Sequence, residues 1–256
     1  MYTNMENQEA KQLITESQNI YLITSKEPEA VASTLALFYT LKELGKNVNL
    51  LMDELPASLG FLAPSLDFIS YPKNFVISIP SNVAQISQIY YEKNDDALKI
   101  HLTLQEGNIK KDNISFYFSE TKPNLVITVG IKDFVKELPT KLDSFGFLLD
   151  SPILNIDNFV PMSTTEVGTS RILDQQVGTN NKKFGKINLV EEESLAEIIN
   201  GLVDAKNKQT SRCLLTSLIV YTGNFKENPT AEVFQLASEL MKKGADIKEI
   251  TENLKI

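Results

Sequence analysis

Polar and charged side chains follow two apolar segments of the sequence, at the points where predicted strands end. Ser25, Lys26 and Glu29 come directly after the β-branched and aromatic run 19–24, and Asp157 closes a second apolar run. Parallel α/β sheets keep their ligands beyond the carboxyl ends of the strands. Hydroxyl and ammonium groups there could bind a phosphate, and carboxylates could hold a hard cation such as Mg²⁺. These residues are therefore candidates for a binding or catalytic site.

The elements that would position these side chains are a strand, a helix and a second strand. Residues 19–24 lack the polar alternation of a half-solvated strand, which predicts a parallel strand covered on both faces. Pro28 fits the first turn of a helix that Gly45 would end, and residues 48–52 predict the next strand. Such a crossover is right-handed, so we expect an α/β fold with a parallel sheet.

From residue 75 onward the apolar residues recur with a period of two. Residues 86–91 and 98–104 flank a turn at 94–96 and predict a hairpin, with residues 114–118 as a strand beside it. Antiparallel strands that interrupt a parallel series are usually insertions. We therefore expect one α/β domain over residues 1–256, with residues 73–119 as a β-hairpin insertion within it.

The rest of the sequence predicts more strands, a long loop and a helical C-terminal third. Residues 160–183 are polar and weakly periodic, as in loops that are functional or mobile. Arg171 in this loop could bind a phosphate or carboxylate through its guanidinium group, or could be solvated. Capping residues and apolar spacing predict a first helix capped by Asn4, strands at 66–70 and 125–129, and helices at 195–206, 209–220, 231–243 and 247–254.

Composition excludes several classes of partner and site. The net charge of −8 argues against a broad surface for duplex DNA or for an anionic membrane. No apolar run reaches the roughly 20 residues of a membrane span. One cysteine and no secretory signal at the start indicate a cytoplasmic protein. His101 is the one histidine and alternation predicts that it faces solvent, so a His-rich metal centre is excluded.

Three pairs of segments together resemble a known family. They are 22–25 with 35–46, 153–157 with 184–199, and 214–225 with 237–246. Their order is similar to that of the DHH phosphoesterases, which include oligoribonucleases and nucleotide phosphatases of the NrnA kind and, more distantly, RecJ-type exonucleases. The resemblance covers most of the chain outside residues 73–119 and 160–183.

The resemblance implies a site with two divalent metals, usually manganese, held by aspartates and histidines. At the corresponding positions this sequence has Ser25 and Lys26, Glu29, Gly130, Asp157 with Asn158 and Phe159, and Tyr221. Asp157 is the clearly retained ligand, and Glu29 is a plausible surviving carboxylate. An ammonium group at Lys26 would repel a dication and could itself bind a phosphate. We also expect this sequence to lack the second, substrate-binding domain of the NrnA type.

Three hypotheses follow. In the first, hydrolysis is lost or severely weakened, and the chain is a regulatory or binding module without a cofactor. It would take a nucleotide, phosphate or short oligonucleotide at Ser25, Lys26, Asp157, Asn158 and Arg171, or would pair with itself or with an active relative.

The second hypothesis is a phosphoesterase that acts on short oligonucleotides or nucleotide phosphates. It would use Mg²⁺ or Mn²⁺ at Glu29, Asp133 and Asp157. The third hypothesis is a structural interaction protein that docks through residues 73–119. Convergence of the three carboxylates around a cavity would favour the enzyme, whereas Lys26 or Tyr221 in that space would argue against it.

Overall fold

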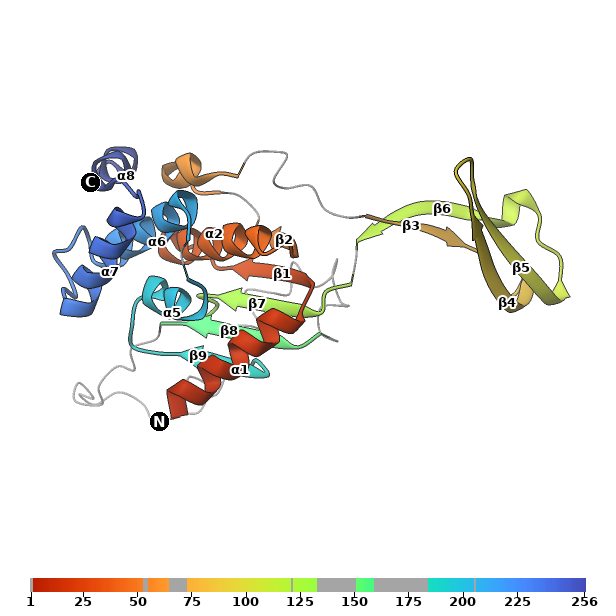
Figure 1. The fold of residues 1–256 in the computed structure, drawn as a ribbon, viewed down its shortest axis with the longest axis horizontal. Helices are drawn as coiled ribbons and strands as arrows, with labels where there is room; N and C mark the ends of the chain where they lie inside the picture. Colours follow the sequence, from red (N-terminus) through yellow and green to blue (C-terminus); the bar gives the residue numbers. More distant parts are fainter. Residues whose placement is uncertain are drawn as a thin grey trace, which may run out of the picture. The chain divides into compact units, whose positions relative to one another are not determined.

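The computed structural model describes residues 2–52, 55–64, 73–120, 122–132, 151–158, 184–204 and 206–256. The chain divides into two compact units (Figure 1). Unit 1 comprises Met1–Tyr71 and Lys122–Ile256, and unit 2 comprises Pro72–Thr121. The second unit includes residues 73–119, the range of the expected insertion.

Unit 1 has an α/β fold with five parallel strands. Its first part contains α1 (Tyr2–Glu16), β1 (Asn19–Thr24), α2 (Pro28–Glu43), β2 (Asn47–Leu51) and a 3-10 helix (Ala57–Leu62). The part after the insertion contains β7 (Leu125–Val129), β8 (Ile153–Asp157), β9 (Ile187–Val190), α5 (Leu195–Leu202), α6 (Lys208–Tyr221), α7 (Ala231–Lys242) and α8 (Ile247–Leu254). The strand order is β2-β1-β7-β8-β9, and every pair is parallel.

Strand β1 is covered on both faces, as its sequence predicts. Ile20 and Leu22 belong to the main core, whereas Tyr21 and Ile23 belong to a second cluster with Val126 of β7. Successive side chains of a strand point to opposite faces, so these two clusters mark the two sides of the sheet. Strand β1 lies between β2 and β7, so its carboxyl end is flanked on both sides by other strands of the sheet.

Helix α2 connects the sheet to the helical layer. Pro28 stands in its first turn, and Gly45 follows it with φ +73°. It is buried almost all round, because β1, β2 and β7 contact one side and α5 and α6 contact others. Figure 1 shows α2 lying along the sheet with α6 and α7 beyond it. This burial fixes where the first turn of α2 lies relative to the strand ends.

Unit 2 consists of two antiparallel pairs of strands. Strand β4 (Ala84–Lys93) pairs with β5 (Leu98–Gly107), and β3 (Lys73–Ser78) pairs with β6 (Ser115–Glu120). The predicted hairpin is confirmed, and Asn94 closes its turn by accepting bonds from the N–H groups of residues 96 and 97. The predicted place of residues 114–118 is wrong. They pair with β3 because the two ends of the insertion meet there, with Ile77 opposite Phe116.

Two predicted boundaries in unit 1 also differ. Helix α1 begins at Tyr2, so Asn4 lies within the helix and is not its cap. Helix α5 ends at Leu202 and not at residue 206, because the backbone turns extended at Val203. The predicted strand at 66–70 and the predicted loop at 160–183 lie outside the described residues. Within the described residues, no helix is long and apolar enough to cross a membrane.

Candidate functional site

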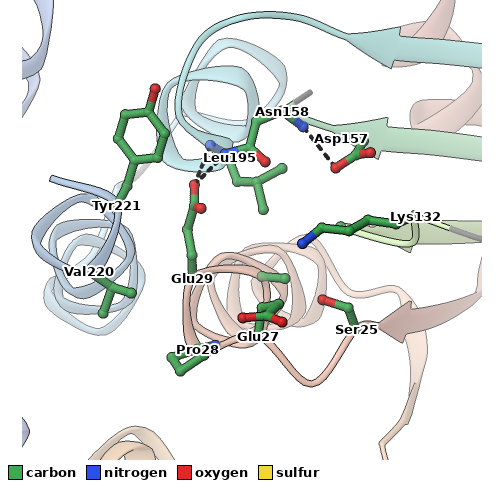
Figure 2. Close-up of a pocket in the computed structure, with 12 residues that line it drawn as sticks. Ser25, Glu27, Pro28, Glu29, Lys132, Asp157, Asn158, Leu195, Val220 and Tyr221 are labelled. Atoms are coloured by element: carbon green, nitrogen blue, oxygen red, sulfur yellow. Dashed lines mark hydrogen bonds between the residues drawn. The ribbon is translucent and has the colours of Figure 1, made fainter. Parts of the chain in front are cut away.

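A cavity of about 240 Å³ lies at the carboxyl edge of the sheet in unit 1. Figure 2 shows the side chains that project into it from the ends of β1, β7 and β8, from the first turns of α2 and α5, and from the end of α6. The lining residues are Ser25, Glu27, Pro28, Glu29, Ala30, Gly130, Lys132, Asp157, Asn158, Leu195, Val220 and Tyr221. This is the edge at which a parallel sheet is expected to bind its ligands.

Ser25 brings a hydroxyl group to the base of the cavity. Its backbone N–H donates to the carbonyl of Val129 at 3.1 Å, which ties the end of β1 to the end of β7. The residue is 8% exposed, and Oγ has no hydrogen-bond partner among the described residues. A buried hydroxyl without a partner is costly, so this group is suited to bind a ligand.

The first turn of α2 forms one wall of the cavity. The first N–H groups of a helix lack intrahelical partners and carry a partial positive charge. Glu27 at the N-cap makes no side-chain capping hydrogen bond, and Pro28 has no N–H group to offer. The amides that follow are therefore not satisfied by the cap, and they border the same space as Ser25.

Glu29 joins three elements at the cavity wall. Its Oε1 accepts one hydrogen bond from the N–H group of Leu195 and one from Nδ2 of Asn158, both at 2.9 Å (Figure 2). Leu195 is the first residue of α5, so the carboxylate lies at the positive end of that helix. Burial raises the pKa of Glu29 and Asp157 raises it further, while the two hydrogen bonds and Lys132 lower it in part.

Lys132 brings positive charge to the cavity from the end of β7. Figure 2 shows its side chain extending across the space between Asp157 and the first turn of α2. Asp157 ends β8, and its Oδ1 accepts a hydrogen bond from the N–H group of Asn158 at 2.9 Å. The cavity therefore combines an ammonium group, amide and hydroxyl donors, and carboxylates.

Gly130 leaves no room for a side chain. Its φ is +64°, and a Cβ atom there would lie 2.7 Å from Cβ of Ala30 and 3.1 Å from Oγ of Ser25. Carbon atoms do not approach this closely without a shift of the backbone. The position at which the resemblance implies an aspartate ligand is thus filled by the contact between β7 and α2.

Tyr221 borders the cavity from the end of α6. Burial raises the pKa of its phenol, and the carboxylates of Glu29 and Glu197 raise it further. The phenol therefore stays neutral near pH 7 and offers a hydroxyl group rather than a negative charge.

The described residues do not fit a centre with two metals. They contain no group of three or more histidine, cysteine or acidic side chains placed to hold a metal ion. One oxygen of Glu29 already accepts two hydrogen bonds, and the Lys132 ammonium group enters the same cavity. A dication beside that ammonium group would be repelled. Asp133 and Phe159 lie outside the described residues.

The structure brings together four of the six predicted binding residues. Ser25, Glu29, Asp157 and Asn158 line one cavity. Lys26 is exposed and is not among the lining residues, and Arg171 lies outside the part of the chain that the structure describes. Sequence reasoning missed Lys132. The signal was present, because Lys132 follows the apolar run 125–129 just as Ser25 follows β1.

Comparisons with known proteins identify the fold. No protein-family model and no curated protein matches this sequence. Among solved structures, an exopolyphosphatase-related protein from Bacteroides fragilis matches with a TM-score of 0.63 and 14% identity. The match covers 98% of this chain and 60% of that one, so this chain spans about three fifths of its length. The α/β fold of this chain is therefore similar to that of an exopolyphosphatase-related protein.

Proposed function

We propose that this phosphoesterase-like protein binds a phosphate-bearing ligand, such as a nucleotide or the end of a short oligonucleotide, without hydrolysing it through two metals. One observation carries the proposal. Oγ of Ser25 is buried without a partner among the described residues, in a cavity that Lys132 and the first turn of α2 also border. A hydroxyl group, an ammonium group and a helix N-terminus are the groups that proteins use to bind phosphate.

The carboxylates of the cavity are compatible with an anion. Glu29 uses Oε1 to accept two hydrogen bonds, and its raised pKa means that it gives up its proton less readily than an exposed glutamate. Asp157 and Lys132 line the same cavity, so the ammonium group partly offsets the charge of the carboxylate. A phosphate would bind on the side of Ser25 and α2, away from the Glu29 oxygen that holds α5.

The proposed loss of two-metal hydrolysis is supported by different residues. Gly130 replaces a ligand and cannot be substituted without a clash, and Lys132 places positive charge where a dication would bind. These features support a binding or regulatory role. The enzyme hypothesis requires three carboxylates, and two of them, Glu29 and Asp157, line one cavity. The third, Asp133, lies outside the described residues.

Calorimetry with matched lysine variants tests binding. Nucleoside monophosphates, a dinucleotide and inorganic phosphate are titrated into wild type, Ser25→Ala, Lys132→Met and Lys26→Met. Loss of a charge-assisted hydrogen bond should weaken binding about tenfold or more in Lys132→Met, and Ser25→Ala should weaken it severalfold. Lys26→Met is the control and should bind as wild type does. Equal affinity in all four proteins, or no binding of any probe, would contradict the proposed site.

A metal experiment tests the second half of the proposal. Mn²⁺ is titrated by calorimetry, and hydrolysis of a dinucleotide and of a nucleotide 3′-phosphate is followed with and without the ion. We expect neither tight binding at two sites nor turnover. Two tightly bound ions with turnover that depends on Asp157 would instead establish the enzyme.

A further inference from the structure

The β4–β5 ribbon of unit 2 has a polar face on which the side chains pair with one another. Residues opposite each other in an antiparallel pair share a face. The rings of Tyr90 and His101 stack with their centroids 4.5 Å apart, and Nζ of Lys99 lies 3.8 Å from Oε1 of Glu92. The side chains of this face contact one another and include charged groups that water can solvate.

The opposite face of the ribbon is apolar. Its cross-strand pairs are Ile86 with Leu104, Ile89 with Leu102, Tyr91 with Ile100 and Lys93 with Leu98, and these eight residues are called the apolar face below. Six of the seven uncharged side chains are between 36% and 75% exposed, and Tyr91 and Ile89 are exposed most. Lys93 at the tip is the one charged member of the face.

We expect an exposed apolar surface of this kind to be buried against another surface. A two-stranded ribbon is at best marginally stable in water unless its apolar face packs against something. Both edges of this ribbon are open as well, because within residues 73–120 β4 and β5 pair only with each other. Contiguous apolar patches of more than a few hundred Å² usually mark interaction sites.

We propose that the apolar face is the surface through which two copies of this chain dimerise, with their ribbons stacked face to face and antiparallel. Two identical ribbons stacked in this way form a small β-sandwich. The exposed side chains amount to roughly 600 Å² per copy, against about 800 Å² per partner in a standard interface. Two copies would thus bury roughly 1,200 Å² in total, which is the lower end of the range for specific interfaces.

The charges on the ribbon favour a second copy. The chain has a net charge of −8, but the apolar face contains no carboxylate. Two copies can therefore stack through this face without bringing acidic side chains of the face together. Antiparallel stacking puts the two Lys93 side chains at opposite ends of the interface. A membrane surface fits less well, because Asp95 and Asp96 lie in the turn at the tip of the ribbon.

Sedimentation equilibrium of the full chain tests the proposal with a matched pair of variants. Ile100→Asp places a charge on the apolar face, and Thr103→Asp places the same charge on the polar face of the same strand. The wild type and Thr103→Asp should both dimerise, whereas burial of two unpaired carboxylates should weaken dimerisation of Ile100→Asp about tenfold or more. Circular dichroism verifies that both variants fold.

Cross-linking provides a readout that adds no charge. Ile100→Cys and Thr103→Cys are each treated with a short bismaleimide, and the native Cys213 is fully buried and should not react. Covalent dimers are expected for Ile100→Cys and not for Thr103→Cys. A wild type that stays monomeric, equal dimerisation of both aspartate variants, or equal cross-linking of both cysteine variants would each overturn the proposal. The proposal would also be overturned if a different protein, and not a second copy of this chain, covered the apolar face.

Discussion

Gly130 shows how one residue can fix the packing of a cavity wall. Its left-handed backbone lets β7 approach α2 so closely that Cβ of Ala30 occupies the space of a side chain. A residue with a Cβ atom would have both to strain its backbone and to displace that contact. The glycine therefore allows the close packing of the cavity wall, and no side chain can project into the cavity from this position.

We expect Gly130→Ala to lower the free energy of unfolding by about 2–4 kcal/mol, from backbone strain and overpacking together. Gly201→Ala is the control, because Gly201 lies in α5 with open space where its Cβ would be. Alanine is the better helix former there and should raise stability by up to about 1 kcal/mol. Urea denaturation measures both variants. Equal stability of Gly130→Ala and wild type would show that β7 and α2 are farther apart than described.

The raised pKa of Glu29 predicts a dependence of stability on pH. Since the folded state holds this proton more tightly than the unfolded chain, the contribution of Glu29 to stability falls as pH rises above its ordinary pKa of 4.5. Glutamine cannot ionise but can still accept both hydrogen bonds. Glu29→Gln should therefore gain stability relative to wild type as pH rises from about 4.5 toward neutrality.

Urea denaturation of both proteins across that pH range measures this difference. The pKa values of Glu191 and Glu193 are also raised, but both residues are present in either protein and cancel in the comparison. Parallel pH profiles of wild type and Glu29→Gln would contradict the burial of the Glu29 carboxyl.

Helices α2 and α6 meet through small polar residues. The hydroxyl groups of Ser33 and Ser217 lie 2.7 Å apart, and both residues are fully buried. Thr40 and Thr210 form a similar pair at 3.2 Å. Small side chains allow the two helices to lie close. In each pair one hydroxyl group donates to the other, which lowers the cost of burying these polar groups between the helices.

A double-mutant cycle on this seam should show strong coupling. Ser33→Ala or Ser217→Ala alone leaves a buried hydroxyl without its partner and should cost about 1–3 kcal/mol. The double variant should cost clearly less than the sum of the two single variants, because no unpaired hydroxyl remains. Chemical denaturation of the four proteins gives the coupling energy. Additive losses would mean that the two hydroxyl groups do not depend on each other.

At the scale of the whole molecule, the chain divides into two units, and β3 and β6 are the first and last strands of the second unit. Lys73 and Glu120 are register partners at the ends of these strands, so a short linker can join them in place of the insertion. The core of unit 1 contains the sheet and its helices, and its cavity uses residues of unit 1 alone. Folding and ligand binding should therefore be properties of unit 1.

We expect a chain with residues 74–119 replaced by a short Gly-Ser linker to unfold in one cooperative transition. It should bind phosphate-bearing ligands as the full chain does, and it should be monomeric. Calorimetry and sedimentation measure these properties, with the full chain as the reference. Loss of cooperative unfolding would show that unit 1 depends on unit 2 for its stability.

The sequence by itself determined most elements and the edge that carries the site. Local periodicity and capping residues predicted β1, α2, the hairpin, and the start of each C-terminal helix within about one residue. Strand ends identified Ser25, the nearby Glu29 and Asp157, because the carboxyl ends of parallel strands lie together in any such sheet. Asn158 was named only through the resemblance to the DHH phosphoesterases.

Tertiary structure decided which side chains face the cavity and what they contact. Lys132 lies in the cavity and Lys26 does not, although both follow strands of the same sheet. Glu29 accepts hydrogen bonds from Asn158 and Leu195, which lie 129 and 166 positions further along the chain. The pairing of β6 with β3 likewise joins the two ends of the insertion. Periodicity reports only on neighbours in sequence, whereas these contacts depend on the path of the backbone after each strand and on the segments that pack against it.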